Sequence, residues 1–399
     1  MATLDTKGLE AQYVKELIEK RGHATLLMDI GSLGKPFFTP DITAEEVARM
    51  GGSTIQKVRS FNEAGPAAEV MACGAIKIAK DLYNSGKIQG VISIGGGMGS
   101  TIASAVMREL PIGFPKFMLS SQKIVQAGIR EFVGNKDIAV MPSVADIAGL
   151  NRLTRKALSN AAGAIVGMIE SPEVEVPPKP LVFMSMLGTT TGCVLKVKSR
   201  LEDKGFEVAV FHTVGVGGMT LEELLNKGYP VKGVIELGIN EIGNELFGGL
   251  ASAGPNRLEA AGKKGIPQII TPGNVEFINF LTPDTLPERY RNRTICFHNP
   301  TSTTPRLNAE ELKLIAETVS KKLNVATGPV KVLIPTRGFS ALDREGVIFY
   351  DPVADRAFVE ALKNSLNGTI ELKEIDAHIN DDEFAEAVAC EFLSLVKPD

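Results

Sequence analysis

Tryptophan is absent from the 399 residues of this chain, and cysteine and histidine occur only four times each. The cysteines are far apart and include no CxxC pair, so neither a zinc cluster nor a dithiol redox motif is present. The histidines form neither HExxH nor HxH. We therefore predict no dedicated metal site, and unpaired cysteines favour a reducing compartment, which indicates the cytoplasm.

An excess of either charge is also lacking, since 43 Lys and Arg face 47 Asp and Glu. This balance gives no general attraction to nucleic acid or anionic lipid. No signal-like segment opens the chain, and no apolar run reaches the ~18 residues that a membrane span needs. We expect a cytoplasmic protein that binds neither nucleic acid nor membrane, and its length predicts two domains.

Short apolar runs recur along the chain, each followed by a glycine-rich or polar turn and then a helical pattern. Gln89–Ile94, for example, leads into Gly95–Gly99 and a helical stretch. This alternation predicts an α/β protein with doubly wound, mainly parallel sheets. The other predicted strands are Ala24–Met28, Lys116–Leu119, Ile138–Met141, Leu181–Met184, Val208–Phe211, Val234–Leu237, Gln268–Ile270 and Val330–Ile334.

The two halves of the chain carry an internal repeat. Four pairs of segments correspond in the same order, and the join lies in the proline-rich stretch 170–180, which suits an extended linker. We predict two tandem Rossmann-like domains related by duplication, residues 1–175 and 176–399. The pairs are Gly8–Gly22 with Gly192–Gly205, Gly90–Gly95 with Gly233–Gly238, Gly113–Leu119 with Gly265–Thr271, and Val140–Ser143 with Leu333–Thr336.

The repeat also shows an asymmetry at the start of the first domain. In the second half the strand Leu181–Met186 precedes the turn at Gly188, whereas only Met1 and Ala2 precede the corresponding turn at Thr3. We therefore predict that the first strand of the first domain is missing from this chain. Either the start is truncated or misassigned, or the first sheet is built differently. In the former case, an open strand position is expected to lower stability and to invite edge pairing.

The loop from Gly95 to Thr101 is the first candidate binding site. It lies between a strand and a helix start, where unpaired N–H groups and the helix dipole favour an anion and glycines allow close approach. It is neither the GxGxxG fingerprint, because Ser100 stands where glycine is needed, nor a Walker A loop. A tight turn without ligand is the alternative. The candidate phosphate-binding residues are Gly95, Gly96, Gly97, Met98, Gly99, Ser100 and Thr101.

The turn Thr3–Gly8 is the second candidate. Asp5 can accept a hydrogen bond or hold a Mg²⁺-bound water, Thr6 can donate a hydroxyl, and Lys7 can pair with a phosphate. The alternative is that an Asp or Thr side chain caps the following helix. The counterpart in the second half, Thr189–Thr191, has hydroxyls without charge, so two ligand sites would bind different ligands.

The second domain has more residues of catalytic type at predicted strand ends. His212 or Glu241 could act as a general base, and Arg257 or Arg337 could bind a carboxylate or phosphate. Asp343 completes the set, which a doubly wound sheet would gather at one crevice. A small carboxylate or phosphorylated metabolite would suit such a site. For each residue the alternative is a loop or cap hydrogen bond.

Several motifs together resemble a known family. They are Thr3–Gly8, Gly95–Thr101, Ser143–Asn151, Ala253–Ala261, Phe297–Pro300, Arg337–Ser340 with Asp343, Phe349–Pro352 and His378–Asp381. The chain is similar to the bacterial and fungal family of uncharacterised proteins related to the ATP-binding domain of the tomato mosaic virus resistance protein. The resemblance implies two tandem Rossmann-like domains, ATP bound mainly by the first, and homodimerisation.

Three functional hypotheses follow. The leading one is a cytoplasmic, homodimeric ATP-binding protein whose phosphates, with or without Mg²⁺, lie on the Gly95–Thr101 loop and the Thr3–Gly8 turn. The second is an enzyme of small-molecule metabolism that uses the second domain. The third is a nucleotide-gated interaction module, since the plant relative blocks viral RNA replication by binding the viral replication protein. Whether a reaction is catalysed stays open at this point.

Overall fold

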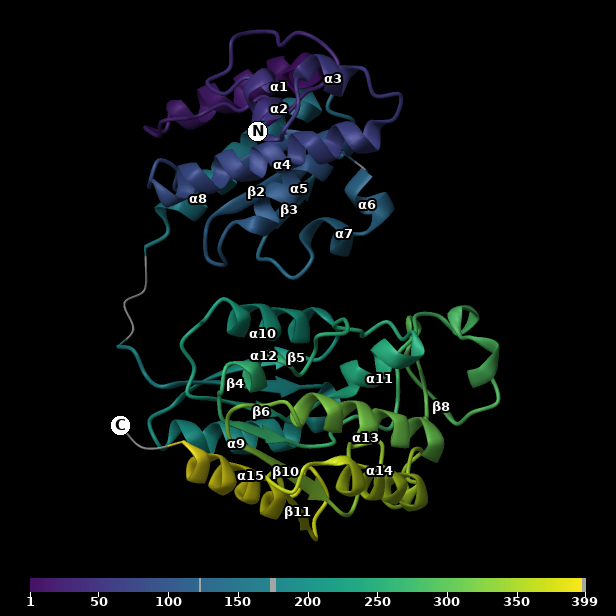
Figure 1. Cartoon of the computed structure of the whole chain (residues 1–399). Coiled ribbons are helices and arrows are strands. Elements are labelled where there is room, and N and C mark those ends of the chain that lie inside the picture. Colours follow the sequence, from purple (N-terminus) through teal and green to yellow (C-terminus); the bar gives the residue numbers. More distant parts are fainter. Residues whose placement is uncertain (122, 173–176, 397–399) are drawn as a thin grey trace. The chain divides into compact units, whose positions relative to one another are not determined.

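The computed structural model describes residues 1–121, 123–172 and 177–396. The chain divides into two compact units, unit 1 (Met1–Glu175) and unit 2 (Val176–Asp399), coloured purple to teal and teal to yellow in Figure 1. Each unit has its own core and is an α/β structure with a parallel sheet, as the sequence predicts. Among the described residues, every helix is too short or too polar to cross a bilayer.

Unit 1 is a three-stranded parallel sheet, in the order β1-β2-β3, between two layers of helices. Side chains of β2 alternate between the layers: Phe117 and Leu119 pack with α1 and α8, while Met118 packs with α2, α4 and α5. The elements are α1 (Leu4–Glu19), α2 (Ala44–Met50), α3 (Ile55–Arg59), α4 (Ala64–Asn84), β1 (Val91–Gly95), α5 (Gly97–Glu109), β2 (Lys116–Ser120), α6 (Lys123–Ala127), α7 (Ile129–Val133), β3 (Ala139–Pro142) and α8 (Arg152–Glu170).

The region beside β1 differs from the prediction. Ala2 forms single parallel bridges to Asp29 on one side and Ile94 on the other, and Met28 bridges to Ile42. The predicted strand Ala24–Met28 is wrong for residues 24–27, which are not in a strand. The physical reason is that a strand needs a neighbour for its main-chain N–H and C=O groups, and Met1 and Ala2 reach only the end of this stretch.

Unit 2 contains a six-stranded sheet whose described pairings are all parallel, in the order β11-β10-β7-β6-β4-β5. The chain adds strands in opposite directions on the two sides of β4, so the topological switch point lies between β4 and β6. Its strands are β4 (Leu181–Met186), β5 (Glu207–His212), β6 (Gly233–Glu236), β7 (Gln268–Ile270), β10 (Val330–Pro335) and β11 (Glu371–Ile375), with an antiparallel pair, β8 (Ile295–Asn299) and β9 (Ser302–Pro305).

Helices cover both faces of the unit 2 sheet (Figure 1). Val182 and Met184 of β4 pack with α9 and α15, while Phe183 packs with α10 and α12. The helices are α9 (Thr191–Glu202), α10 (Val216–Asn226), α11 (Asn240–Phe247), α12 (Ala260–Lys263), α13 (Ala309–Leu323), α14 (Pro352–Ser365) and α15 (Asp382–Leu395), with short 3₁₀ turns η1 (Gly188–Thr190), η2 (Pro283–Thr285) and η3 (Glu288–Tyr290).

Candidate functional site

The two loops predicted to bind a nucleotide lie together at the carboxyl end of β1. Ala2 pairs with Ile94, so the chain leaves this sheet position at Thr3 beside the start of α5. A methyl group on Gly99 would lie 3.7 Å from Cγ2 of Thr3. The start of α1 and the start of α5 therefore border the same edge of the sheet.

The N-terminus of α5 is capped by glycine alone. Gly96 is the N-cap, no described side chain caps the helix, and the first intrahelical N–H is that of Ser100, which donates to Gly96 O at 2.9 Å. The N–H groups of the first turn, Gly97 to Gly99, have no acceptor within a helix of this geometry. A methyl group on Gly96 would meet only Ser121 Oγ, at 3.8 Å. This arrangement offers main-chain donors, a helix dipole and open space to an anion.

The hydroxyls of Ser100 and Thr101 bind protein acceptors. Ser100 Oγ lies 2.7 Å from Ser120 Oγ in the buried contact between α5 and β2. Thr101 Oγ1 donates to Gly97 O at 2.9 Å. The main chain of this loop is therefore better placed than these side chains to meet a phosphate, and the predicted contribution of the two hydroxyls stays a prediction.

Asp5 supports the loop that follows Asp29. Its Oδ2 accepts hydrogen bonds from Leu33 N at 2.8 Å and Gly34 N at 3.0 Å. Its Oδ1 is buried and has no hydrogen-bond partner in the part of the chain that the structure describes. Asp5 thus has a structural role and one carboxylate oxygen left to accept a donor.

The helix cap of α1 comes from a residue that the sequence did not indicate. Asp29 Oδ1 accepts from Leu4 N at 3.0 Å and from Gly31 N at 2.8 Å, whereas the N-cap residue Thr3 makes no side-chain cap bond. Burial raises the pKa of Asp29, and the nearby charge of Asp5 adds to the rise. A methyl group on Gly31 would lie 2.8 Å from Asp5 Oδ1 and 3.0 Å from Asp29 Oδ1, so only glycine fits between the two carboxyls.

Thr6 and Lys7 complete the turn. Thr6 is exposed, and its Oγ1 lies 2.9 Å from Thr3 Oγ1. Lys7 departs from helical geometry, with φ −125° and ψ 22°, so it separates the first turn from the rest of α1. Within the described residues Lys7 forms no ion pair, which leaves its ammonium group available to an anionic ligand.

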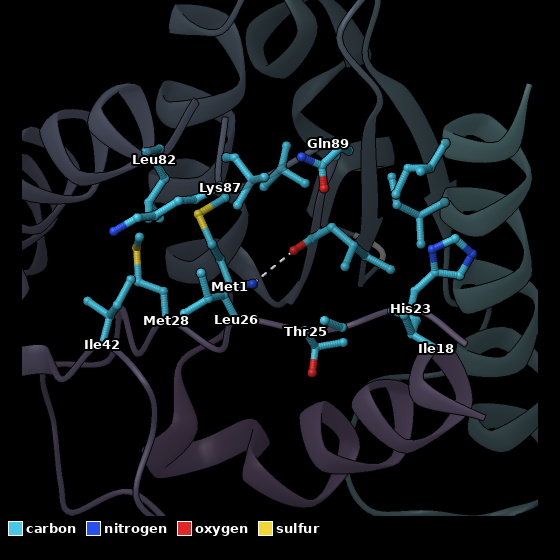
Figure 2. A pocket seen from close by; sticks show the side chains of 18 residues that line it. Met1, Ile18, His23, Thr25, Leu26, Met28, Ile42, Leu82, Lys87 and Gln89 are labelled. Atoms are coloured by element: carbon cyan, nitrogen blue, oxygen red, sulfur yellow. Dashed lines mark hydrogen bonds between the residues drawn. The ribbon is translucent and has the colours of Figure 1, made fainter. Parts of the chain in front are cut away.

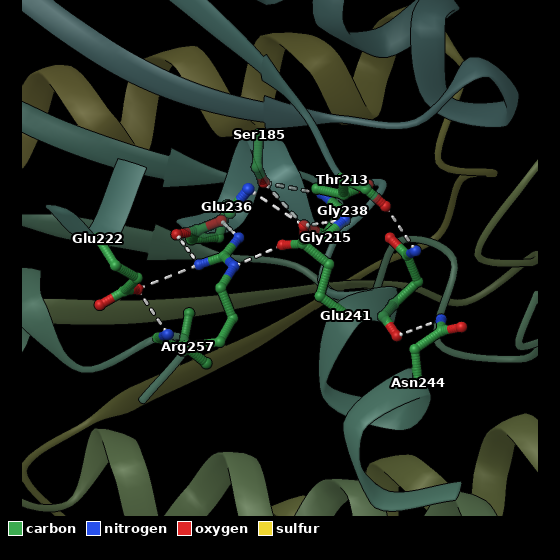
Figure 3. Close-up of polar contacts among 12 residues, drawn as sticks. Ser185, Thr213, Gly215, Glu222, Glu236, Gly238, Glu241, Asn244 and Arg257 are labelled. Atoms are coloured by element: carbon green, nitrogen blue, oxygen red, sulfur yellow. Dashed lines mark hydrogen bonds and ion pairs between the residues drawn. The ribbon is translucent and has the colours of Figure 1, made fainter. Parts of the chain in front are cut away.

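Unit 2 places Arg257 at the centre of a buried charge cluster (Figure 3). Its guanidinium binds Glu236 in a bidentate manner, with Nη1–Oε1 2.7 Å and Nη2–Oε2 2.6 Å, and donates from Nε to Glu241 Oε2 at 2.6 Å. Glu222 Oε1 lies 3.4 Å from Nη1. One guanidinium therefore faces three carboxylates in a site closed to solvent.

Two of these carboxylates also hold main-chain loops. Glu241 Oε1 accepts from Gly215 N at 2.8 Å and Gly218 N at 3.1 Å, at the start of α10. Glu222 accepts from Leu258 N at 2.6 Å and Ala260 N at 2.8 Å. Burial raises the pKa of both carboxyls, and Arg257 opposes the rise. These contacts give Glu241 and Arg257 a structural role, and their predicted catalytic role stays a prediction.

The other residues predicted for catalysis in unit 2 lie in different surroundings. His212 ends β5 and is exposed, and its partial burial lowers its pKa. Asp343 is buried and accepts from Phe339 N at 2.8 Å. Arg337 forms an exposed ion pair with Asp376 at 2.8 Å. The structure thus brings Glu241 together with Arg257 and leaves His212, Asp343 and Arg337 outside their cluster.

A second buried charge cluster includes Asp343, which the sequence indicated, while its other members, Glu276, Arg306 and Asp355, were missed by reasoning from the sequence. Arg306 Nη2 donates to Asp355 Oδ1 at 2.7 Å, and Asp343 and Glu276 interact electrostatically with this pair. Burial, followed by the charge of Asp343, raises the pKa of Glu276 to about 8 and that of Asp355 to about 9. The available signal was a single acid inside an apolar run, Val275–Ile278.

These features define the class of the protein: two tandem Rossmann-like α/β units, with polar and glycine-rich loops at the carboxyl ends of parallel strands. Within that class, the chain belongs to the Uncharacterised protein family (UPF0261). The N-terminal domain of this family matches residues 1–174, and its C-terminal domain matches residues 179–396.

Two bacterial relatives match over the whole chain, and a plant relative matches over most of it. A UPF0261 protein of Clostridium tetani (strain Massachusetts / E88) is 41% identical over 399 residues, which is 100% of this chain and 98% of that protein. One of Rhizobium meliloti (strain 1021) is 38% identical over 400 residues, with the same coverage. The ToMV resistance protein Tm-1(GCR237) of Solanum lycopersicum is 35% identical over 328 residues, 80% of this chain and 43% of the tomato protein. The resemblance expected from the motifs is confirmed.

Proposed function

We propose that the chain is a nucleotide-binding protein that holds the phosphates of ATP at the N-terminus of α5 in unit 1. The observation that carries the proposal is the glycine-capped first turn of α5, which has no side-chain cap and lies beside the start of α1. The resemblance to the ATP-binding domain family supports ATP as the anion. A cytoplasmic location and a homodimer belong to the same proposal.

The two units differ in the residues at the helix start that follows β1 in unit 1 and β6 in unit 2, and this difference supports unit 1 as the nucleotide-binding unit. Aligning Gly95 with Gly238 places Met98 at the position of Glu241. In unit 2 the Glu241 carboxylate reaches from α11 to the loop before α10. In unit 1 the corresponding loop is held by Asp5 from α1, so α5 presents glycines and a methionine there. An anionic ligand that approaches the start of α5 would therefore meet no carboxylate from that helix.

The side chains around the loop suit a triphosphate. Lys7 supplies a cation, and Thr6 supplies an exposed hydroxyl. Among the described residues, no cluster of His, Cys, Asp and Glu is placed to hold a metal ion. Mg²⁺ bound together with ATP would be held mainly by the phosphates and water. Asp5 would act by holding the loop at Leu33 and Gly34, since its other carboxylate oxygen is buried against Gly31.

The experiment compares the thermal unfolding of the wild type and of Gly96→Asp with Mg-ATP, ADP, AMP and NAD. Gly96 has extended backbone angles, φ −85° and ψ −153°, so an aspartate there would cap α5 and stabilise the ligand-free protein by roughly a few tenths of a kcal/mol. Its carboxylate would also occupy the place of the phosphates. We expect ATP at 100 times its dissociation constant to stabilise the wild type by about 2.7 kcal/mol, or roughly 5–10 °C, and Gly96→Asp to lose this rise.

The matched control is Gly65→Asp, which adds the same charge to the first turn of α4 at an exposed position with no heavy atom within 4 Å of the new Cβ. It should keep the full ATP response. No rise in the folded wild type, or a full rise in Gly96→Asp, would overturn the proposal. Catalysis in unit 2 and nucleotide-gated capture of a partner remain alternatives, and they predict metabolite turnover and nucleotide-dependent binding respectively.

A further inference from the structure

A loop of unit 1, residues 31–40, lies at the same sheet edge as the starts of α1 and α5. It follows Asp29, which forms a parallel bridge to Ala2 directly ahead of α1. Residues 30–43 connect this bridge to α2, whereas residues 213–215 alone join β5 to α10 in unit 2. Long loops at the carboxyl ends of parallel strands are frequent sites of ligand binding. The extra length in unit 1 therefore falls at the edge where we propose that the nucleotide binds.

One end of the 31–40 loop is fixed by hydrogen bonds to its main chain. The N–H groups of Leu33 and Gly34 donate to Asp5 Oδ2, and Arg59 Nη2 donates to Gly34 O at 2.7 Å. A carboxylate from α1 and a guanidinium from α3 thus hold the same short stretch. These bonds use the main chain of Leu33, and the residue is 83% exposed.

The other end of the loop is fixed by Phe37, which packs against α1. Phe37 N donates to Leu4 O at 3.3 Å, and a methyl group on Gly8 would lie 2.7 Å from Phe37 Cβ. Phe37 is nonetheless 61% exposed, so much of its ring faces solvent. The exposed ring therefore lies against the turn Thr3–Gly8, which is part of the proposed phosphate site.

Exposure alternates along the middle of the 31–40 loop. Leu33, Lys35 and Phe37 are exposed, whereas the residues between them are half-buried. The loop thus presents a cation between two large apolar side chains to solvent. Single exposed apolar residues are common on protein surfaces, but two that are held in place beside a polar ligand site are typical of a binding surface.

The pocket of unit 1 shown in Figure 2 lies elsewhere. It has a volume of about 260 Å³, surrounds Met1, and is lined by Lys87 and Gln89, which precede β1, and by His23 and Thr25. These residues are near the amino end of β1, at the edge opposite the 31–40 loop. A nucleotide with its phosphates at the starts of α1 and α5 would therefore place its base on a loop surface and not in this pocket.

We propose that the exposed side chains of the 31–40 loop bind the base of the nucleotide, which lies against Leu33 and Phe37. Every base has apolar faces that stack on aromatic side chains, and the aliphatic side chain of Leu33 extends the same contact. Lys35 adds a positive charge that favours an anionic ligand. This inference rests on the nucleotide binding proposed above, and it names the residues that hold the base.

The test measures the dissociation constants of Mg-ATP and of magnesium tripolyphosphate, which has no base, by isothermal titration calorimetry. The full chain is compared with Phe37→Ser and with Leu33→Ser, the second of which changes a side chain that is almost fully in solvent. The matched control is Val125→Ser in α6, which is 62% exposed and follows β2 on the other side of β1. Circular dichroism checks that each variant is folded.

We expect Phe37→Ser and Leu33→Ser each to weaken ATP binding by about fivefold or more and to leave tripolyphosphate binding unchanged. Val125→Ser should bind ATP as the wild type does. Unchanged ATP binding in both loop variants, or an equal loss of ATP and tripolyphosphate binding, would overturn this inference alone. A folded wild type that does not bind ATP would overturn the nucleotide proposal and this inference with it.

Discussion

Replacement of Arg257 by methionine tests whether the buried cluster of unit 2 is structural. The guanidinium donates to Glu236 and Glu241 at 2.6–2.7 Å, and its side chain is fully buried. Methionine fills a similar space without charge, so three buried carboxylates would lose their counter-ion. Removing one partner of a buried pair costs about 3–5 kcal/mol, and we expect a loss of this size at pH 7.5.

The loss should depend on pH in a defined direction. Burial already raises the pKa of Glu222 and Glu241, and without Arg257 these values would rise further above those of the unfolded chain. Carboxyls with a raised folded pKa favour folding at low pH and oppose it as pH rises above the unfolded value of about 4.3. The difference between Arg257→Met and the wild type should therefore shrink toward pH 5.

The assay is urea unfolding at pH 5 and pH 7.5, followed by far-UV circular dichroism, with hydrogen exchange of β6 to assign the transition to unit 2. The control Arg337→Met removes an ion pair whose side chains are 60% and 80% exposed, and it should change stability by less than about 1 kcal/mol. An Arg257→Met loss below about 1 kcal/mol, or one that does not grow with pH, would refute the structural interpretation of the cluster.

Two further predictions concern unit 2. Gly218→Ala should destabilise unit 2 by about 1–3 kcal/mol or more in urea unfolding, because the new methyl group would lie 2.0 Å from Glu241 Oε2. The control Gly188→Ala should be near neutral, because no heavy atom lies within 4 Å of its new methyl group. Glu276 and Asp355, with pKa values of about 8 and about 9, should be protonated at neutral pH. Their pKa values in the folded protein lie above those in the unfolded chain, so stability should fall as pH rises from about 4 through 9. Glu276→Gln should flatten this fall. A stability that rises between pH 6 and 9 would contradict the raised pKa values.

The parallel sheets could be predicted from the sequence because each strand is a short apolar run before a glycine or polar turn. Gln89–Ile94 indicates β1, found at Val91–Gly95, and Lys116–Leu119 indicates β2, found at Lys116–Ser120. Ala24–Met28 has the same composition but lacks a neighbouring strand along most of its length. Strand formation depends on a partner in space, which a local pattern does not report.

The candidate site was predictable in position and less so in detail. Strand-to-helix loops at the carboxyl ends of parallel strands must share one edge, which is why Thr3–Gly8 and Gly95–Thr101 lie together. The cap by Asp29 and the burial of Glu241 with Arg257 were not visible. Both depend on contacts between residues far apart in the chain, and a charged residue in a loop looks the same in the sequence whether it is buried or exposed.

Corresponding loops of the two units are supported by carboxylates from different helices. In unit 1, Asp5 of α1 holds the loop at Leu33 and Gly34, and in unit 2, Glu241 of α11 holds the loop at Gly215 and Gly218. In each copy of the repeat a carboxylate accepts hydrogen bonds from the main chain of this loop, but the carboxylate comes from a different helix in each unit. When support can move from one helix to another, a duplicated copy is free to change the residues at the vacated helix start without losing the loop. A carboxylate on α1 in unit 1 and one on α11 in unit 2 therefore do the same work, which leaves the start of α5 in unit 1 without the acid that α11 carries.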